Sequence, residues 1–236
     1  MNSRFHSIEM ENLTIAYQDT IVFDHFNLTL PASGCICFFG PSGSGKTTLL
    51  SAVAGLKKPL SGKIRAQQDG MEESRAPGSF PDIAYVFQED RLIPWLTALE
   101  NVLFVIPKKG EKPKMEQQKI EPQKNTQDMR EKPDEIARHW LKKVGLLDAA
   151  DKYPSQLSGG MKQRVNIARA LAFDAPIILL DEPFKGLDDQ IKSQIIMIFQ
   201  ELKKDRLILL VTHDKEDASL LADKIIPVEQ PGHADQ

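Results

Sequence analysis

The 236-residue sequence predicts an α/β fold: a mostly parallel sheet with helices, an N-terminal antiparallel β subdomain and an inserted helical subdomain. Three patterns lead to this prediction. Apolar and polar residues alternate over the first 30 positions, short apolar runs recur further along, and the stretch between Gln88 and Leu157 has a helical pattern. Short buried strands separated by helical stretches are typical of parallel sheets. We therefore expect a single domain over residues 1–236.

The first 30 residues have the period of two that is typical of strands. Their apolar positions include Ile8, Met10, Leu13, Ile15, Tyr17, Ile21, Phe23, Leu28 and Leu30. Successive side chains of a strand point to opposite faces, so this pattern buries one face and leaves the other in water. The segment is predicted to form the antiparallel subdomain.

A buried strand, a glycine-rich loop and a helix are predicted to follow directly. The apolar run Gly34–Phe39 predicts the strand, and the spacing of apolar residues over 46–56 predicts the helix, closed by Gly55 and Pro59. Between them the chain reads Gly-x-x-x-x-Gly-Lys-Thr, in the order that a phosphate-binding loop requires. Three further buried strands are predicted at 83–87, 177–180 and 207–211.

Residues from 89 to about 165 are predicted to form the helical subdomain. The stretches 92–105 and 136–144 look helical, with Asp134 as the N-cap of the second and Gly145 as its stop.

Two segments are predicted to be exposed loops, at 67–81 and 107–133. The second is rich in Lys, Glu, Gln and Pro and has too few apolar residues to offset its ordering entropy, so we expect a mobile surface insertion. The alternative, a docking or nucleic-acid-binding arm, is less favoured because its eight basic and five acidic residues largely cancel.

The composition is that of an ordinary globular protein, with 41% hydrophobic and 27% charged residues. A formal net charge of −3 provides no bulk charge for nucleic-acid binding. No run of about 18 apolar residues is present, and residues 1–6 lack the layout of a signal peptide, so we expect a cytoplasmic protein. Cys35 and Cys37 are predicted to be buried in a strand, without a disulfide or a metal.

The glycine-rich loop carries the strongest chemical signal. Its backbone amides can converge on phosphate oxygens at a helix N-terminus, Lys46 is expected to reach the β- and γ-phosphates, and Thr47 to offer its hydroxyl to Mg²⁺. The expected nucleotide-binding residues of this segment are Gly40, Pro41, Ser42, Gly43, Ser44, Gly45, Lys46, Thr47 and Thr48.

A second signal is the acidic pair that follows the predicted strand 177–180. A buried strand that ends in carboxylates delivers them to the edge of the sheet, where ligands bind in α/β folds. Asp181 is expected to hold Mg²⁺, and Glu182 to polarise an attacking water.

Six motifs in this order resemble those of the ATP-binding-cassette (ABC) ATPases, which have a P-loop NTPase core. They are the phosphate loop, Gln88, Leu157-Ser158-Gly159-Gly160 with Gln163-Arg164, Ile177 to Pro183, Gly186-Leu187-Asp188 and Val211-Thr212-His213-Asp214. The resemblance extends from Tyr17 to about Val228 and implies an ATPase with ATP and Mg²⁺ as cofactors.

In that family two chains form a head-to-tail dimer that encloses two ATP molecules. The resemblance implies that Ser158, Gly159 and Gly160 lie against the γ-phosphate of the ATP held by the partner copy's phosphate loop. A serine that caps a helix, followed by free amides, also suits an anion on physical grounds.

The remaining motifs imply four further roles. His213 would contact the γ-phosphate, and Gln88 would sense Mg²⁺ and the attacking water. Asp188 would lie in the loop that crosses the dimer interface. Tyr17 would stack on adenine; the alternative is a tyrosine packed in a strand.

The stretch from Val86 to Val102, with Trp95 in it, resembles importer ATPases for nitrate, sulfonates and taurine. In importers this region receives a helix of the membrane permease; alternatively, Trp95 is a core residue of the helical subdomain. The implied partners are a second copy, permease subunits and an extracytoplasmic solute-binding protein, with the chain at the cytoplasmic face of the membrane and no nucleic acid. The sequence differs from those relatives at Lys185-Gly186 and at 215–218.

Two other functions fit the sequence less well. A soluble ABC ATPase of DNA repair or translation is less favoured because such proteins commonly carry coiled-coil arms or two cassettes, whereas 107–133 contains prolines and no heptads. A catalytically dead regulatory cassette is disfavoured because every catalytic position is filled. The transported solute, the direction of transport and the permease are not encoded in this chain.

Overall fold

The computed structural model describes residues 5–18, 20–68, 82–106 and 132–229. They form two compact units, one of Met1–Arg91 with Asp174–Gln236 and one of Leu92–Phe173. Most of the predicted insertion 107–133, and residues 69–81 of the other predicted loop, lie outside the described residues.

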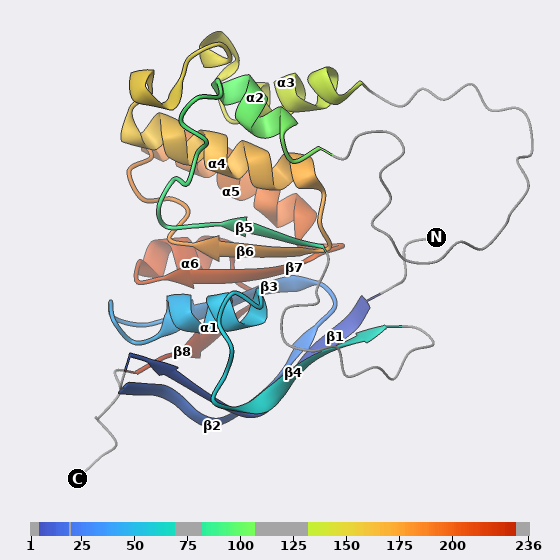
Figure 1. Ribbon diagram of the computed structural model, residues 1–236, viewed down its shortest axis with the longest axis vertical. Coiled ribbons are helices and arrows are strands. Elements are labelled where there is room, and N and C mark those ends of the chain that lie inside the picture. The colour runs from blue at the N-terminus through green and yellow to red at the C-terminus, as the bar shows by residue number, and fades with distance from the viewer. Residues whose placement is uncertain (1–4, 19, 69–81, 107–131, 230–236) are drawn as a thin grey trace, which may run out of the picture. The chain divides into compact units, whose positions relative to one another are not determined.

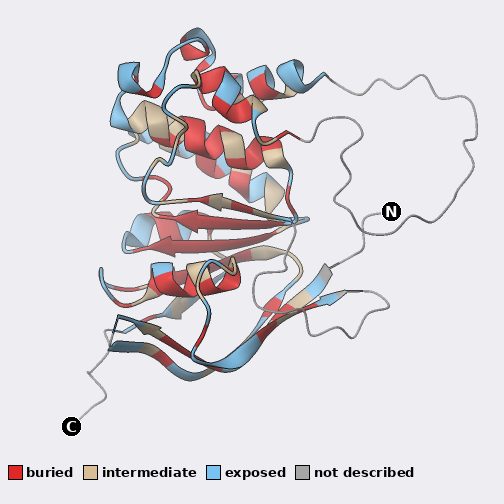
Figure 2. Ribbon diagram, in the orientation of Figure 1, coloured by how far each residue is buried: buried red, intermediate tan, exposed pale blue. Residues whose placement is uncertain are grey.

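The first unit is built on a five-stranded sheet with the order β5-β6-β7-β3-β8, in which all neighbours are parallel. The strands are β3 (Gly34–Phe39), β5 (Ile83–Val86), β6 (Ile177–Asp181), β7 (Leu207–Thr212) and β8 (Lys224–Pro227). Every residue of β6 and β7 is buried (Figure 2), as continuous apolar runs in a parallel sheet require. This sheet confirms the predicted α/β class.

Three helices belong to the same unit: α1 (Lys46–Val53), α5 (Asp189–Leu202) and α6 (Lys215–Leu221) (Figure 1). The prediction placed the end of the first helix at residue 56, whereas α1 ends at Val53. The chain leaves the helix there because Gly55 adopts the left-handed conformation, with φ of 71°.

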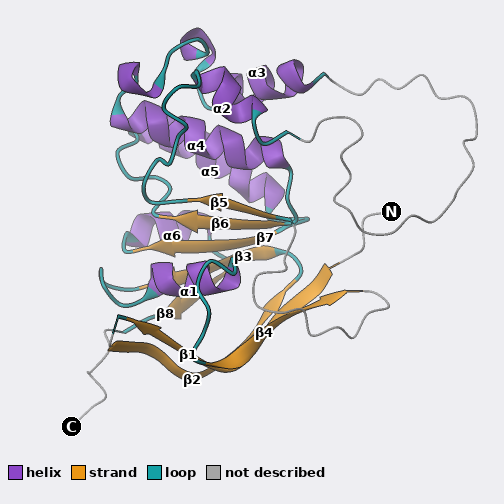
Figure 3. Ribbon diagram, in the orientation of Figure 1, coloured by secondary structure: helices purple, strands orange, loops and turns teal. Residues whose placement is uncertain are grey.

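A separate three-stranded antiparallel sheet has the order β2-β1-β4 (Figure 3). It consists of β1 (Phe5–Tyr17), β2 (Thr20–Pro31) and β4 (Ser61–Gln68). The first two strands were predicted, and side chains such as Ile8 and Leu13 of β1 are fully buried. The third was not, because Ile64 and Ala66 are its only apolar residues.

The second unit is helical, with α2 (Ala98–Leu103), α3 (Pro133–Lys143) and α4 (Gly159–Phe173), and the short 3₁₀ helices η1 (Leu147–Ala149) and η2 (Pro154–Gln156). None of the helices in the described ranges is long and apolar enough to cross a membrane.

The predicted helix 92–105 is wrong in its first six residues, since α2 begins only at Ala98. Pro94 disfavours helical geometry at Ile93, and the buried Asn101 holds this stretch in another shape. The Asn101 amide donates to the carbonyls of Ile93 and Leu96 at 3.2 and 3.0 Å, and its oxygen accepts from the Ile93 amide at 2.8 Å. Thr97 then caps α2.

The predicted N-cap of the next helix is also wrong. Lys132 is the N-cap of α3, and Asp134 lies in its first turn, where its carboxylate accepts from Arg138 at 2.7 Å. Pro133 explains the earlier start, because proline is favoured at the first helical position. Gly145 follows the helix end with φ of 68°, as its role as a stop requires.

Candidate active site

The phosphate loop runs from the end of β3 into α1, and two of its glycines have no room for a side chain. A Cβ on Gly40 would stand 2.0 Å from the Val228 carbonyl oxygen. A Cβ on Gly45, which has φ of 91°, would stand 2.7 Å from Cβ of Val22. The loop is therefore enclosed by residues from β2 and from the segment after β8.

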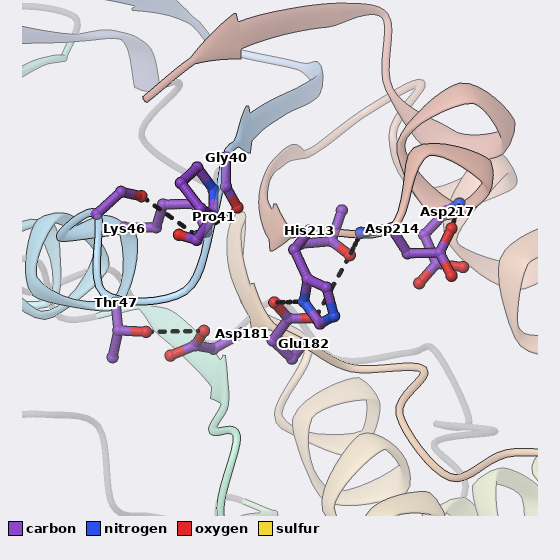
Figure 4. A network of polar contacts seen from close by, with 11 residues as sticks. Gly40, Pro41, Lys46, Thr47, Asp181, Glu182, His213, Asp214 and Asp217 are labelled. Carbon is purple, nitrogen blue, oxygen red and sulfur yellow. Dashed lines mark hydrogen bonds and ion pairs between the residues drawn. The ribbon is translucent and has the colours of Figure 1, made fainter. Parts of the chain in front are cut away.

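Lys46, the first residue of α1, is held inside this loop (Figure 4). Its ammonium donates to the carbonyls of Gly40 and Pro41 at 2.8 and 2.6 Å and to the Ser44 hydroxyl at 3.3 Å. Burial lowers the pKa of Lys46, while Glu182 and Asp181 act in the opposite direction. The lysine charge is thus placed among the oxygens of the loop and faces two carboxylates.

Thr47 and Asp181 bring two oxygen ligands together. The Thr47 hydroxyl donates to Oδ1 of Asp181 at 3.1 Å, and burial raises the pKa of the Asp181 carboxyl. Oxygen ligands of this kind fit Mg²⁺, which usually takes one or two protein groups and completes its shell with phosphate and water.

Glu182 is fixed by both backbone and side chain. It has φ of 48°, an uncommon conformation for a residue other than glycine, and its amide donates to the Val211 carbonyl at 2.9 Å. Its carboxylate accepts from the Thr212 hydroxyl at 3.4 Å and lies 2.7 Å from Nδ1 of His213. Such strain is often found at functional sites.

A pocket of about 600 Å³ brings most of the predicted site residues of this unit together. Its lining includes Tyr17, Ser42, Gly43, Gly45, Lys46, Thr47, Thr48, Gln88, Asp181 and Glu182. At its entrance the Tyr17 ring is 57% exposed, and the Lys57 ammonium lies 5.8 Å from the ring centroid. An exposed ring beside a phosphate loop is available for stacking, which argues against the packed-strand alternative for Tyr17.

Other predicted residues lie elsewhere. Asp188 is the N-cap of α5 and accepts from the Ile191 amide at 3.0 Å. Ser158 and the two glycines after it belong to the Leu92–Phe173 unit, where Oγ of Ser158 accepts from the Met161 amide at 3.3 Å at the start of α4. Trp95 is 74% exposed, so the alternative that it is a core residue of the helical subdomain is excluded.

Cys35 and Cys37 are both buried and free, as predicted. Burial raises the pKa of Cys37 to about 12, with Glu182 acting in the same direction. These thiols are unreactive at neutral pH.

Three contributors to the site were missed at the sequence level. Val22 touches the loop at Gly45, Thr212 bonds to Glu182, and Lys57 faces Tyr17. Thr212 could have been identified from the sequence, because it is a hydroxyl residue that ends a buried strand directly before His213. The sequence around Val22 and Lys57 contains no pattern that indicates a place in the site.

Replacement of Asp181 with asparagine is expected to raise the Tm of the nucleotide-free protein in EDTA by about 2 to 4 °C. Burial disfavours the charged carboxylate, while an amide oxygen can keep the bond from Thr47. Since the pKa is raised, the penalty is complete above the raised value and absent below the carboxyl's ordinary value of 3.8. Asp82→Asn, at an exposed position before β5, is the control and should leave Tm unchanged. A lower Tm for Asp181→Asn would contradict this expectation.

Comparison with known proteins gives consistent matches. A family model described as ABC transporter matches residues 23–185. The bicarbonate transport ATP-binding protein CmpD of Synechocystis is 37% identical over 235 residues, covering 96% of this chain and 76% of that protein. The sulfate/thiosulfate import ATP-binding protein CysA of Escherichia coli K12 is 36% identical over 229 residues, covering 95% of this chain and 58% of that protein.

Solved structures match over almost the whole chain. The dimeric post-hydrolysis state of the ATP-binding cassette MJ0796, bound to ADP and Pi, has a TM-score of 0.75 at 29% identity and covers 94% of this chain. The alignment includes 96% of that cassette. A second dimeric structure of MJ0796, described as a bacterial ABC transporter cassette, has a TM-score of 0.77.

Proposed function

Because this chain belongs to the ABC transporter family and is an ATP-hydrolysing subunit of the importer type, we propose that it energises uptake of a small solute through a separate permease. The observation that supports the proposal most strongly is the match, over 95% or more of the chain, to one protein named a transport ATP-binding protein and another named an import ATP-binding protein. CmpD and CysA are named for bicarbonate and sulfate or thiosulfate, which are small anions. This supports a solute of the nitrate, sulfonate or taurine class.

In the proposed reaction the loop amides and Lys46 bind the phosphates of ATP, and Tyr17 stacks on the base. Thr47 and Asp181, with Gln88 beside them, would hold Mg²⁺, which neutralises phosphate charge when bound. Glu182 orients the attacking water and accepts its proton, while His213 holds the Glu182 carboxylate at 2.7 Å. Most of the acceleration would come from positioning and charge stabilisation.

The site would be completed by a second copy of the chain. We propose that Ser158, Gly159 and Gly160 of that copy face the γ-phosphate, and that Asp188 lies in the interface loop. The dimeric cassette structures support assembly of two chains. The exposed start of α4 supports the role of Ser158, because its amides remain available to an anion.

The membrane partners are a permease and, for import, an extracytoplasmic solute-binding protein. Trp95 is proposed to contact the permease, since an aromatic side chain that is 74% exposed suits a protein interface. The chain would then reside at the cytoplasmic face of the membrane as a peripheral subunit.

To test the function, the gene for this chain is co-expressed with its neighbouring genes, and the chain is purified from the membrane fraction. We expect a multi-spanning protein to co-purify, and proteoliposomes of the complex to accumulate labelled taurine, sulfonate or nitrate with ATP but not with ADP. Co-purification with ribosomes or DNA, and no membrane partner, would instead support a soluble ABC ATPase. ATP-dependent uptake of an unrelated solute would refute only the solute class.

A further inference from the structure

An ion pair joins helices α5 and α6 of the first unit. Helix α5 begins directly after Asp188, and helix α6 begins directly after His213 and Asp214. The Lys192 ammonium on α5 contacts Oδ1 of Asp217 on α6 and lies 3.6 Å from Oε2 of Glu216. The side chains of Lys192 and Asp217 are only 14% and 9% exposed. Neither residue is among those that line the nucleotide pocket.

On the α5 side, the pair lies one helical turn from Asp188. The Lys192 amide donates to the Asp188 carbonyl at 2.8 Å, and the Asp188 side chain caps the same turn through the Ile191 amide. A displacement of Lys192 along α5 would therefore carry the Asp188 loop with it.

On the α6 side, the pair lies in the first turn after His213 (Figure 4). Asp214 caps that turn by accepting from the Glu216 and Asp217 amides at 2.8 and 3.4 Å. The Asp214 amide in turn donates at 3.0 Å to Oγ1 of Thr212, the hydroxyl that bonds to Glu182. A continuous set of hydrogen bonds thus leads from the catalytic carboxylate to Asp217.

The charges around the pair favour an ionised lysine. Burial by itself lowers the pKa of Lys192, but the bond to Asp217 and the nearby carboxylates of Asp214 and Glu216 give a net rise. A buried ion pair adds little stability relative to apolar packing, whereas removing one partner leaves a charge uncompensated. This pair is better explained by the geometry that it fixes.

We propose that Lys192 is a positioning residue that couples the His213 loop to the Asp188 loop, through its ion pair with Asp217. Movement of His213 at the γ-phosphate of one site then shifts α6, α5 and the loop that faces the second chain. This role rests on the proposed two-chain site. It gives each nucleotide site a mechanical connection to the interface, and with it cooperativity between the two.

The test compares four variants of the full chain in steady-state ATP hydrolysis and in ATP binding. Lys192→Met removes the charge, Asp217→Asn removes its partner, and Lys192→Arg conserves the pair. Lys203→Met is the control, because Lys203 connects the other ends of the same two helices: it donates to the Leu221 carbonyl at the end of α6 at 2.9 Å and pairs with Asp223 at 2.6 Å. Thermal unfolding of each variant reports on folding.

We expect Lys192→Met and Asp217→Asn to lower kcat about tenfold and to bring the Hill coefficient from about 2 towards about 1. The affinity for ATP at low protein concentration should change less than about twofold, since neither residue lines the pocket. Lys192→Arg should restore cooperativity. Lys203→Met should lower Tm without changing the Hill coefficient.

Cooperative hydrolysis by Lys192→Met at the wild-type rate would overturn the coupling role alone. So would an equal loss of cooperativity in Lys203→Met, because any connection between α5 and α6 would then have the same effect. A wild-type chain that hydrolyses ATP without cooperativity or dimerisation would contradict the two-chain site itself. The two failures are therefore distinguishable.

Discussion

Replacing Glu182 with glutamine is expected to lower ATP turnover by about a hundredfold or more while leaving ATP binding intact. The amide keeps the size of the side chain, and its oxygen can still accept from Thr212, but it cannot accept the proton of the attacking water. Phosphate release measures the loss, and equilibrium binding of labelled ATP measures what remains. We also expect Mg-ATP to accumulate a stable dimer of this variant, visible in size-exclusion chromatography.

The control is Glu201→Gln, at an exposed carboxylate whose ion-pair partner is Lys204. It should hydrolyse ATP at the wild-type rate and remain in the wild-type oligomeric equilibrium. Retained turnover in Glu182→Gln would exclude Glu182 as the group that activates water. A loss of both binding and turnover would point instead to collapse of the loop around Thr212.

Mixing two inactive variants is expected to recover ATP hydrolysis, and this is the second large effect. Lys46→Met removes the lysine that we propose to bind phosphate, and Ser158→Arg places a long side chain at the start of α4. In a head-to-tail dimer each site takes Lys46 from one chain and Ser158 from the other. A mixed dimer therefore contains one site with both defects and one intact site.

Each variant alone should show turnover reduced by about a hundredfold or more. An equimolar mixture should recover up to about a quarter of the wild-type rate, because half of its dimers are mixed and each mixed dimer has one intact site. Ser155→Arg, at an exposed position in η2, is the control for an arginine near this helix and should be active by itself. If the mixture stays as inactive as its components, the two residues do not serve opposite chains.

The sequence predicted those residues of the candidate site that belong to short continuous motifs. The loop 40–47, the pair Asp181-Glu182 and His213 each follow a short apolar run, and such runs form buried strands whose carboxyl ends meet at one edge of a sheet. The contact of Val22 with Gly45 was not predictable, because it depends on packing between β2 and the loop. A valine in a strand has the same local pattern wherever it packs.

The errors in the helical unit and in the antiparallel sheet have a similar origin. Residues 92–97 have helical spacing, but the buried amide of Asn101 satisfies their backbone groups in a non-helical shape. The third strand of the antiparallel sheet was missed because β4 is mostly polar, with only Ile64 and Ala66 buried among its described side chains, and depends on its pairing with β1. In both cases a partner distant in the sequence outweighs local preference.

The contact between Gly40 and the Val228 carbonyl has a consequence for synthesis on the ribosome. Val228 is placed by the pairing of β8 with β3, and its amide donates to the Phe39 carbonyl at 2.7 Å. A nascent chain that has emerged only as far as α6 holds the residues that we propose to bind phosphate, yet it lacks the backbone that closes this loop. Such non-local pairing forms late. We therefore expect the phosphate loop to reach its closed form only after Val228 has been synthesised.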